Sequence, residues 1–367
     1  MALQKFLTPA NDYAQLDEYL STLNARKIML VHGKSMTRLA IGAHFDQIFE
    51  RFNIIRFNDF EPNPQYESIL RGVEVFNREG CDAIIGVGGG SAIDTAKCIK
   101  LFSTMPPDVD RLKQPVFANA VELLAIPTTA GSGSEATPYA IFYRGDTRLA
   151  TGDADAVPRA VLFDAGTLIN LPDYQKKVTL LDALCHSIES FWSVRANELS
   201  MNYAREAIRL LVSNKDQYVG GSTDLQNCTF IMYAANLAGR AISITGTTAG
   251  HAMSYRLTKK FGLAHGHAVA RCLVEIWKFM LEIAIAHKHV QLLNVFNELA
   301  EAMGCRTPAD AIEMLRRTLS DWKLDAPLEV EPLMDELVSS VSKKQVANGP
   351  VSFNDDILRR LYRAIGG

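Results

Sequence analysis

Three histidines and one aspartate in the second half of the sequence could bind a metal ion. Asp182 and His186 are four residues apart in a helical pattern, so both side chains project from one face. On its own, such a pair would more often lie on a solvent-exposed helix surface than bind a metal. His251 and His265 each adjoin a glycine, where the backbone can turn so that the imidazole points inward. Imidazole and carboxylate ligands suit Fe²⁺ or Zn²⁺ better than Mg²⁺ or Ca²⁺, and the four residues together predict a transition-metal site.

The run Gly88-Gly89-Gly90-Ser91 could wrap a phosphate. It follows a short apolar segment, and consecutive glycines let backbone N–H groups point at an anion beside the N-terminus of a helix. Ser91 could cap that helix. The spacing departs from the dinucleotide-binding fingerprint, because the third glycine is replaced and no acidic residue follows about 20 positions later. A tight turn without a ligand is the alternative.

A second small loop, residues 127–135 (PTTAGSGSE), follows another apolar segment. Its hydroxyl groups, among them those of Thr128, Thr129 and Ser132, could donate hydrogen bonds to phosphate or ribose oxygens. Open α/β sheets bind ligands at the carboxyl ends of their strands, which favours a binding role over that of a plain loop.

Two kinds of segment must position these residues. The first half alternates short apolar runs with helical patterns, as a parallel α/β layer does. Strands are predicted over residues 27–32, 53–57, 82–87, 122–126 and 160–163. From about residue 177 helical patterns dominate, over 178–194, 202–212, 225–242, 267–286, 291–303 and 308–322. We predict an α/β dinucleotide-binding domain over residues 1–175 and an all-helical metal-binding and catalytic domain over 176–367, joined by a proline-containing connection between Leu171 and Thr179.

The composition is that of an ordinary globular protein. The 367 residues are 48% apolar and 22% charged, with a formal net charge of -3. Mixed charges of this kind give no reason to expect a nucleic acid or an anionic membrane as partner. The six cysteines are scattered singly, which indicates a reducing compartment. Neither a signal-peptide stretch over residues 1–11 nor a long apolar run is seen, so we expect a cytoplasmic protein.

Together these segments resemble the iron-containing alcohol dehydrogenases, the group III family related to glycerol dehydrogenase and dehydroquinate synthase. The matching motifs are GGGSAIDTAK over 88–97, PTTAGSGSE over 127–135, DALCHSIESFWS over 182–193 and the pair His251 and His265. The resemblance covers nearly the whole chain. It implies the dehydroquinate synthase-like fold, with an α/β N-terminal domain, an all-α C-terminal domain and a metal in the cleft between them.

The resemblance also assigns site residues. It implies metal ligands at Asp182, His186, His251 and His265. It implies that the cofactor lies along the first domain, with its pyrophosphate on Gly88, Gly89, Gly90 and Ser91 and its nicotinamide and adenosine near Asp94, Thr128, Thr129 and Ser132.

Three positions depart from the usual family pattern. Tyr255 stands where many members carry a further histidine that is proposed to relay protons. His267 stands where a small aliphatic residue is usual and could restore a titratable group, or could merely pack at a helix start. Arg148 stands where relatives often have a lysine near the nicotinamide. These three are the candidate catalytic residues.

Substrate and cofactor can be argued from two segments. Residues 251–270 look most like a subgroup that reduces phosphonoacetaldehyde to 2-hydroxyethylphosphonate, and the cations that could bind the phosphonate are Arg148, Arg256, Lys259 and Lys260. Relatives that select NAD commonly place an acid at the end of the first strand, where this chain has Gly33 and Lys34. We therefore predict that these two residues contact the cofactor and that NADP(H) is favoured over NAD(H).

Several alternatives stay open. Within the family they are a dehydrogenase for short-chain alcohols, small diols or 4-hydroxybutyrate. A lyase of the dehydroquinate synthase type would show no net change in NAD(P)H, and it lacks the Asp182-x-x-x-His186 pattern. The third alternative is a non-catalytic member of the family that still binds a metal. The family often dimerises through an N-terminal strand, and residues 3–7 could serve for a homodimer.

Overall fold

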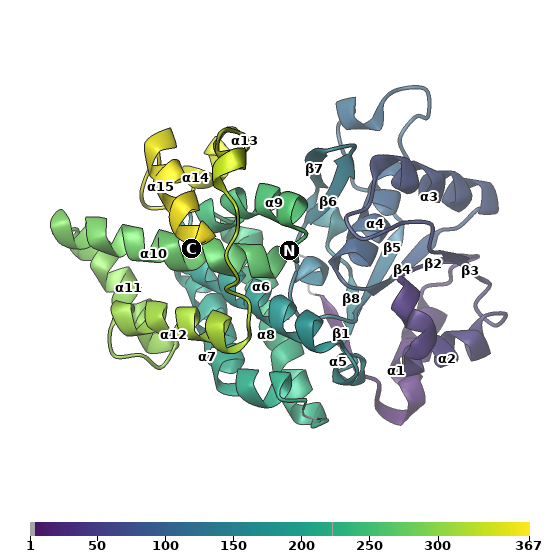
Figure 1. Cartoon of the computed structure of the whole chain (residues 1–367). Coiled ribbons are helices and arrows are strands. Elements are labelled where there is room, and N and C mark those ends of the chain that lie inside the picture. Colours follow the sequence, from purple (N-terminus) through teal and green to yellow (C-terminus); the bar gives the residue numbers. More distant parts are fainter. Residues whose placement is uncertain (1–3, 222) are drawn as a thin grey trace. The chain divides into compact units, whose positions relative to one another are not determined.

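A computed structural model describes residues 4–221 and 223–367 of the chain (Figure 1). The chain divides into two compact units. The first contains the residues up to Leu171 together with 223–232, and the second contains the remainder. In this division the helix that begins at Asp173 belongs wholly to the second unit. The assignment of 223–232 to the first unit was not predicted.

The first unit contains a six-stranded parallel sheet, drawn as purple and blue arrows in Figure 1. Its strand order is β1 (Lys5–Leu7), β8 (Ala160–Leu162), β5 (Glu122–Pro127), β4 (Ala83–Gly88), β2 (Ile28–His32) and β3 (Ile54–Phe57). The strands predicted from the apolar runs are confirmed, and their ends differ by a single residue. Of the predicted N-terminal strand, Leu3 lies outside the described residues.

Helices cover both faces of this sheet. They are α1 (Ala10–Thr22), α2 (Ala40–Ile48), α3 (Tyr66–Glu79), α4 (Gly90–Phe102) and the short α5 (Gly166–Ile169). Alternate residues of β4 enter different cores: Ile85 packs with Phe45 of α2, whereas Ile84 packs with Ile99 of α4. A parallel sheet buried on both faces needs apolar residues at nearly every strand position, and this explains why continuous apolar runs predicted the strands.

The first unit also contains an antiparallel hairpin that the sequence analysis missed. Its strands are β6 (Tyr139–Arg144) and β7 (Thr147–Gly152), and Arg148 of β7 pairs with Tyr143. The connection is Gly145-Asp146, in which Gly145 has a positive φ of 58°. A glycine–aspartate pair between two alternating segments is a signal for a two-residue hairpin turn.

The second unit is helical, and among its described residues no strand occurs. Its helices are α6 (Asp173–Trp192), α7 (Glu198–Val219), α8 (Leu225–Thr245, of which residues from Tyr233 onward belong to this unit), α9 (Ala249–Phe261), α10 (His265–Ala286), α11 (Val290–Ala302), α12 (Pro308–Asp321), α13 (Met334–Ser339), α14 (Lys343–Val346) and α15 (Asp355–Gly366). The predicted fold class, an α/β domain followed by an all-α domain, is confirmed. Helices α9 and α13 to α15 were not among the helical patterns predicted.

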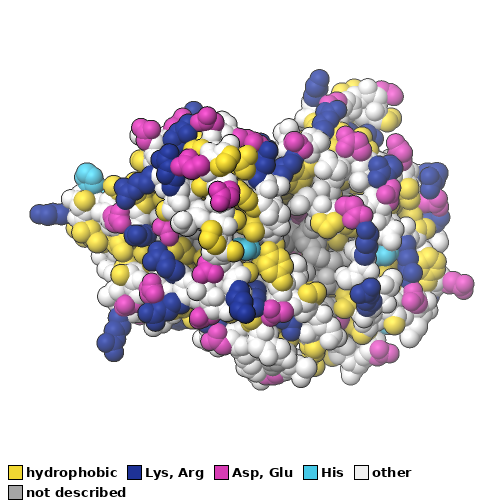
Figure 2. Space-filling view, viewed as in Figure 1, with side chains coloured by type: hydrophobic (Ala, Val, Ile, Leu, Met, Phe, Trp, Pro, Cys, Tyr) yellow, Lys and Arg dark blue, Asp and Glu magenta, His cyan; other side chains and the backbone are white. Residues whose placement is uncertain are grey.

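Two further expectations can be compared with the structure. Across the described ranges, none of the helices combines the length and the apolar character that a membrane crossing requires. Acidic and basic side chains are intermingled over the visible face of the molecule, as the mixed composition predicted (Figure 2).

Candidate metal centre

One face of helix α6 carries the first part of the site. Asp182, His186 and Glu189 follow one another at helical spacings of four and three residues, so their side chains share a face. All three are buried, and Glu189 is completely inaccessible to solvent. A helix surface with three buried ionisable groups is unusual, because each group must find a partner or a cation.

The remaining histidines come from the beginnings of two other helices. His251 is in the first turn of α9, and His265 is the first residue of α10. One ligand atom from each of Asp182, His186 and His251 lies within 4.8 Å of the others. His265 Nε2 is 4.0 Å from Asp182 Oδ1, and the ring centroids of His265 and His251 are 5.2 Å apart. The structure therefore brings three predicted ligands into one cluster and places the fourth, His265, beside it.

The unpaired polar atoms of this cluster fit a bound cation. Among the described residues, neither Asp182 Oδ1 nor His186 Nδ1 has a hydrogen-bond partner, although both atoms are buried. Buried polar atoms are normally bonded. Fe²⁺ or Zn²⁺ bound at about 2.0–2.2 Å from each ligand would bring ligand atoms to within about 4.4 Å of one another. The distances of 3.8 Å and 4.0 Å from Asp182 Oδ1 to the Nε2 atoms of His251 and His265 satisfy this limit.

The side chain of His265 is 38% exposed, unlike those of the other three residues. The cluster is therefore buried on the side of α6 and open to solvent on the side of His265. A catalytic metal site needs such an open side, because the substrate oxygen must take a coordination position.

The glycines beside His251 and His265 do not form the backbone turns that the sequence predicted. Gly250 and Gly266 lie inside helices α9 and α10, so neither supplies a turn. A Cβ atom on Gly266 would clash with the carbonyl oxygen of Val178 and lie 2.7 Å from the Cβ of Asp182. The absence of a side chain thus lets the start of α10 approach α6 closely enough for His265 to reach the cluster.

Glu189 is a buried neighbour of the cluster that the sequence analysis did not identify. Its Oε2 atom contacts His251 Nδ1, and its Oε1 atom accepts hydrogen bonds from Gly250 N at 2.8 Å and from Thr248 Oγ1 at 2.5 Å. Burial raises the pKa of Glu189, while the hydrogen bond from Thr248 and the charge of His186 act in the opposite direction. The available signal was its spacing, three residues after His186 on the same helical face.

Tyr255 lies beside the exposed ligand. Its ring stacks on that of His265, with centroids 5.5 Å apart and planes 9° from parallel. Gln345 Nε2 donates a hydrogen bond of 2.9 Å to the Tyr255 oxygen and so holds the phenol in place. Tyr255 thus sits on the open side of the cluster, as a residue that handles a substrate proton would.

His267 makes different contacts. Its Nε2 atom bonds the carbonyl oxygen of Leu324 at 2.6 Å, and its Nδ1 atom bonds the hydroxyl of Tyr174 at 3.1 Å. The carbonyl can only accept, so Nε2 carries the proton and Nδ1 accepts from Tyr174. Burial also lowers the pKa of His267. Both nitrogens of the neutral ring are therefore occupied, which does not favour the predicted role as a proton carrier.

In the first unit, the predicted phosphate loop lies at the carboxyl ends of the strands. Gly88 ends β4 with a φ of +151°, and α4 begins at Gly90. A Cβ atom on Gly89 would lie 3.0 Å from Thr129 Oγ1, and one on Gly90 would lie 2.9 Å from Ser132 Oγ. The glycine run and the loop over 127–135 are thus adjacent, and their role as a phosphate cradle stays a prediction.

The prediction that Ser91 caps helix α4 is wrong. The cap position is occupied by Gly89, and Ser91 is already inside the helix. Ser91 Oγ instead accepts a hydrogen bond of 3.2 Å from the backbone N–H of Asn63. The helix begins at Gly90, two residues before the start that a cap at Ser91 would give.

Two ionisable residues of α4 anchor the first strand of the hairpin and the segment before it. Asp94 accepts hydrogen bonds from Ser134 Oγ and, at 3.0 Å, from the backbone of Ile141. Lys97 Nζ donates at 2.7 Å to the carbonyl oxygens of both Thr137 and Tyr139. Burial lowers the pKa of Lys97 to about 8 and raises that of Asp94. Whether Asp94 also contacts the cofactor stays a prediction.

Several predicted cations have acidic partners. Lys34 Nζ lies 2.6 Å from Glu61 Oε1, so an acid is present at the edge where the sequence analysis counted only a cation. The structure therefore gives no support to the predicted preference for NADP(H) over NAD(H). Arg256 and Lys260 both lie near Glu336, at 3.3 Å and 2.9 Å.

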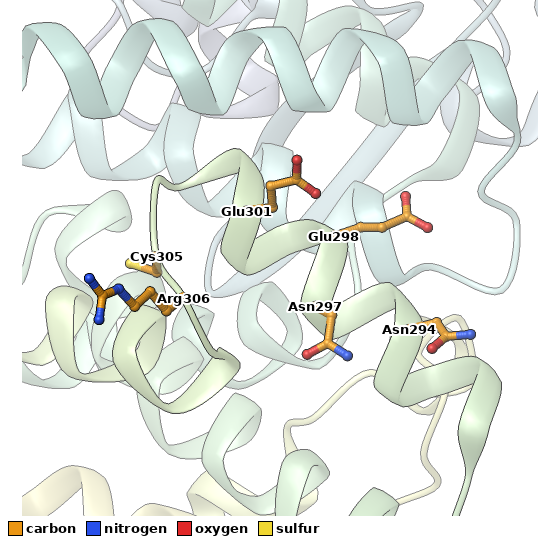
Figure 3. A pocket seen from close by; sticks show the side chains of 6 residues that line it. All are labelled: Asn294, Asn297, Glu298, Glu301, Cys305 and Arg306. Atoms are coloured by element: carbon orange, nitrogen blue, oxygen red, sulfur yellow. The ribbon is translucent and has the colours of Figure 1, made fainter.

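A surface hollow of about 530 Å³ lies elsewhere in the second unit. Figure 3 shows that its lining side chains come from α11 and the loop that follows, and they are Asn294, Asn297, Glu298, Glu301, Cys305 and Arg306. None of them is a predicted site residue, and the hollow is separate from the metal cluster.

Comparisons with known proteins agree with this geometry. Residues 4–165 match the model of the family described as iron-containing alcohol dehydrogenase, and residues 177–353 match that of its C-terminal domain. Aldehyde-alcohol dehydrogenase 2 of Entamoeba histolytica is 30% identical over 83% of this chain and 38% of its own length. Phosphonoacetaldehyde reductase of Streptomyces viridochromogenes is 34% identical over 54% of this chain and 53% of its own length. These alignments thus span only about a third to a half of the two relatives.

The fold is similar to that of a solved 1,3-propanediol oxidoreductase. The TM-score is 0.88 at 25% sequence identity, and the match covers 98% of this chain and 97% of the other.

Proposed function

Since the chain belongs to the iron-containing alcohol dehydrogenase family, we propose that it is a metal- and NAD(P)-dependent dehydrogenase that interconverts a small aldehyde and its alcohol. The observation that carries this proposal is the convergence of one carboxylate and three imidazoles within one helical unit. The lyase alternative has less support, because both family models that match describe alcohol dehydrogenases.

Asp182, His186, His251 and His265 would hold the metal. When bound, a divalent iron or zinc ion supplies a Lewis acid that polarises the carbonyl oxygen and stabilises negative charge on it. The burial of Asp182 and His186 excludes water from one side of the cluster, whereas the exposed side at His265 admits the substrate. Tyr255, stacked on His265, is the residue best placed to hold the proton that the product alcohol needs.

The cofactor would bind in the first unit. The adjacent loops at Gly89, Gly90, Thr129 and Ser132 leave no room for additional side-chain atoms, as a close approach of backbone to pyrophosphate requires. Gly33 donates its N–H to Val87 O at 3.1 Å, which places the end of β2 beside this cradle. We propose a nicotinamide dinucleotide here. Arg148, on the hairpin next to the segment that Asp94 anchors, is the candidate cation on the nicotinamide side.

A small anionic aldehyde such as phosphonoacetaldehyde is the proposed substrate. The support is the 34% identity to a phosphonoacetaldehyde reductase over about half of this chain. Arg256, Lys259 and Lys260, on the helix that also carries His251, would attract an anionic group. The glutamate that pairs with two of these cations reduces their net effect. Short-chain alcohols, diols and 4-hydroxybutyrate are the alternatives within the family.

A homodimer is proposed through the outer edge of β1. Among the described strands, β1 pairs with β8 and stands at the end of the sheet order, so a strand of a second chain could extend the sheet at this edge. The proposal is checked by light scattering of the full chain and of a Phe6→Pro variant.

The function is tested by metal analysis and turnover together. Purified protein is assayed for iron and zinc, and oxidation of NADH and NADPH is followed with phosphonoacetaldehyde, succinic semialdehyde and a neutral short-chain aldehyde. We expect metal-dependent oxidation of a reduced cofactor, lost in His186→Ala together with the metal. Metal binding without turnover of any aldehyde would favour a non-catalytic relative, and loss of activity without loss of metal would refute the ligand assignment.

A further inference from the structure

The carboxylate of Glu189 lies between a proposed metal ligand and the start of a helix. Its Oε2 atom contacts Nδ1 of His251, and the other ring nitrogen of that histidine, Nε2, lies 3.8 Å from Asp182 Oδ1. Its Oε1 atom receives N–H groups from the first turn of α9. We infer that Glu189 is a positioning residue that fixes the tautomer of His251 and thereby sets the metal affinity of the cluster.

The hydrogen-bond donors around Oε1 favour the ionised carboxylate, whose Oε2 atom can only accept a hydrogen bond. Gly250 N at 2.8 Å and Thr248 N at 3.2 Å can only donate. Trp192 Nε1, which can only donate, gives a hydrogen bond of 3.1 Å to the hydroxyl of Thr248. The proton of the Thr248 hydroxyl is therefore directed to Glu189 Oε1, which lies 2.5 Å away. Oε1 is thus surrounded by donors and cannot carry a proton itself.

With Oε1 restricted to accepting, the carboxylate offers a second acceptor at Oε2. His251 satisfies it by donating from Nδ1, which leaves the lone pair of Nε2 directed toward Asp182 and the metal position. In the other tautomer Nε2 would carry a proton and could not coordinate. Carboxylates that orient a ligating histidine in this way typically change metal affinity by about 10–100-fold when they are replaced.

The substitution Glu189→Gln tests whether Glu189 fixes the tautomer of His251, because the amide has one acceptor and one donor end. If the amide oxygen accepts from Gly250 and Thr248, the NH₂ group faces His251 Nδ1 and favours the tautomer that cannot bind metal. If the amide is turned, its NH₂ group faces the donors of α9 instead. The side-chain volume is almost unchanged, so packing around the fully buried position is retained.

The inference rests on the proposed metal site, and the experiment separates the two. Full-length protein is freed of metal by chelation and titrated with Zn²⁺ alone against a chromophoric chelator. We expect Glu189→Gln to bind Zn²⁺ about 10–100-fold more weakly than the wild type. The matched control is Glu301→Gln, which makes the same change at an exposed position of α11 (Figure 3) and should bind Zn²⁺ as the wild type does.

A role of Glu189 confined to capping α9 would lower the melting temperature of the metal-free and the Zn²⁺-loaded protein equally. The inference instead expects the increase in melting temperature on adding Zn²⁺ to shrink in Glu189→Gln. Equal Zn²⁺ affinities of Glu189→Gln and wild type would overturn the inference and leave the metal site intact. Failure of the wild type to bind Zn²⁺ would overturn the site itself.

A second measurement uses the wild-type chain and does not depend on whether Glu189→Gln folds. Long-range ¹⁵N–¹H correlation spectra of the metal-free wild-type chain, labelled at histidine, report which ring nitrogen of His251 carries the proton. We expect Nδ1–H for His251, assigned by comparison with His251→Gln. A signal for protonated Nε2 with an unprotonated Nδ1 would contradict the inference.

Discussion

The rings of Tyr255 and His265 lie almost parallel, 9° apart, with their centroids separated by 5.5 Å. Tyr255 comes from the second turn of α9, one turn after His251, and so one helix positions both a ligand and the phenol that covers another ligand. The phenol stands on the solvent side of the proposed metal, where a product alkoxide would need a proton.

Replacing Tyr255 by phenylalanine keeps the stacking on His265 and removes only the hydroxyl. We expect kcat for aldehyde reduction to fall by about 100-fold, the lower end of the range for loss of a general acid, with the metal content unchanged. Steady-state kinetics with metal analysis checks this, and Tyr233→Phe, at an exposed position, is the control. A normal kcat in Tyr255→Phe and a reduced kcat in His267→Gln would transfer the role to His267.

Introducing a methyl group at Gly266 should separate α10 from α6. Because the added Cβ would clash with Val178 O and press on Asp182, we expect Gly266→Ala to lose about 1–3 kcal/mol of unfolding free energy and most of its bound metal. Urea unfolding and metal analysis measure both effects. The control is Gly33→Ala, where no atom lies within 4 Å of the added Cβ. Full metal content in Gly266→Ala would disprove this account of the close approach.

A methyl group at Gly90 should interfere with cofactor binding and leave the metal in place. The new Cβ would lie 2.9 Å from Ser132 Oγ, and it would also narrow the space above the helix N-terminus. We expect the KM for the reduced cofactor to rise at least tenfold in Gly90→Ala. The double variant with Ser132→Ala relieves the contact with the hydroxyl, so it should recover part of the affinity if that contact is the cause. An unchanged KM in Gly90→Ala would argue that the cofactor binds elsewhere.

The buried lysine of α4 should make stability depend on pH. Burial lowers the pKa of Lys97 to about 8 in the folded protein, below its ordinary value near 10.5. Between these two values the unfolded chain binds more protons, so this group makes the unfolding free energy increase as pH rises from 8 to 10.5. Urea unfolding at pH 7.5 and 9.5 should show this increment as the difference between wild type and Lys97→Met. An identical pH slope in both proteins would contradict the burial of a titrating amine.

The same lysine variant should also be less stable at pH 7.5. Lys97→Met leaves the carbonyl oxygens of Thr137 and Tyr139 without this donor and removes from the buried Asp94 the positive charge that acts on it most strongly. We expect a loss of about 3–5 kcal/mol of unfolding free energy, as is typical when one partner of a buried charged pair is removed. The matched control is Lys113→Met, outside the buried core.

Local pattern was sufficient for the sheet and for part of the ligand set. The runs that became β2, β4 and β5 are apolar except for His32 at the end of β2 and Glu122 at the start of β5, since both faces of a parallel sheet are buried, and that property is visible without any knowledge of neighbours. The pair Asp182 and His186 was recognisable because a helix has a known period. His251 and His265 were assigned with the help of the family resemblance, and the structure brings them to the same point.

Contacts between segments far apart in the chain determined the features of the site that the sequence did not reveal. The spacing of Glu189 from His186 was its only signal in the sequence, and its contacts exist only because α9 begins against α6 and presents Thr248, Gly250 and His251 to its carboxylate. Gly266 looked like a turn residue, whereas the packing of α10 on α6 makes it a point of close approach. Glu61 lies 27 residues from Lys34, yet it neutralises the cation on which the cofactor preference depended. Periodicity specifies which face of an element is buried, but only the folded chain specifies which atoms meet there.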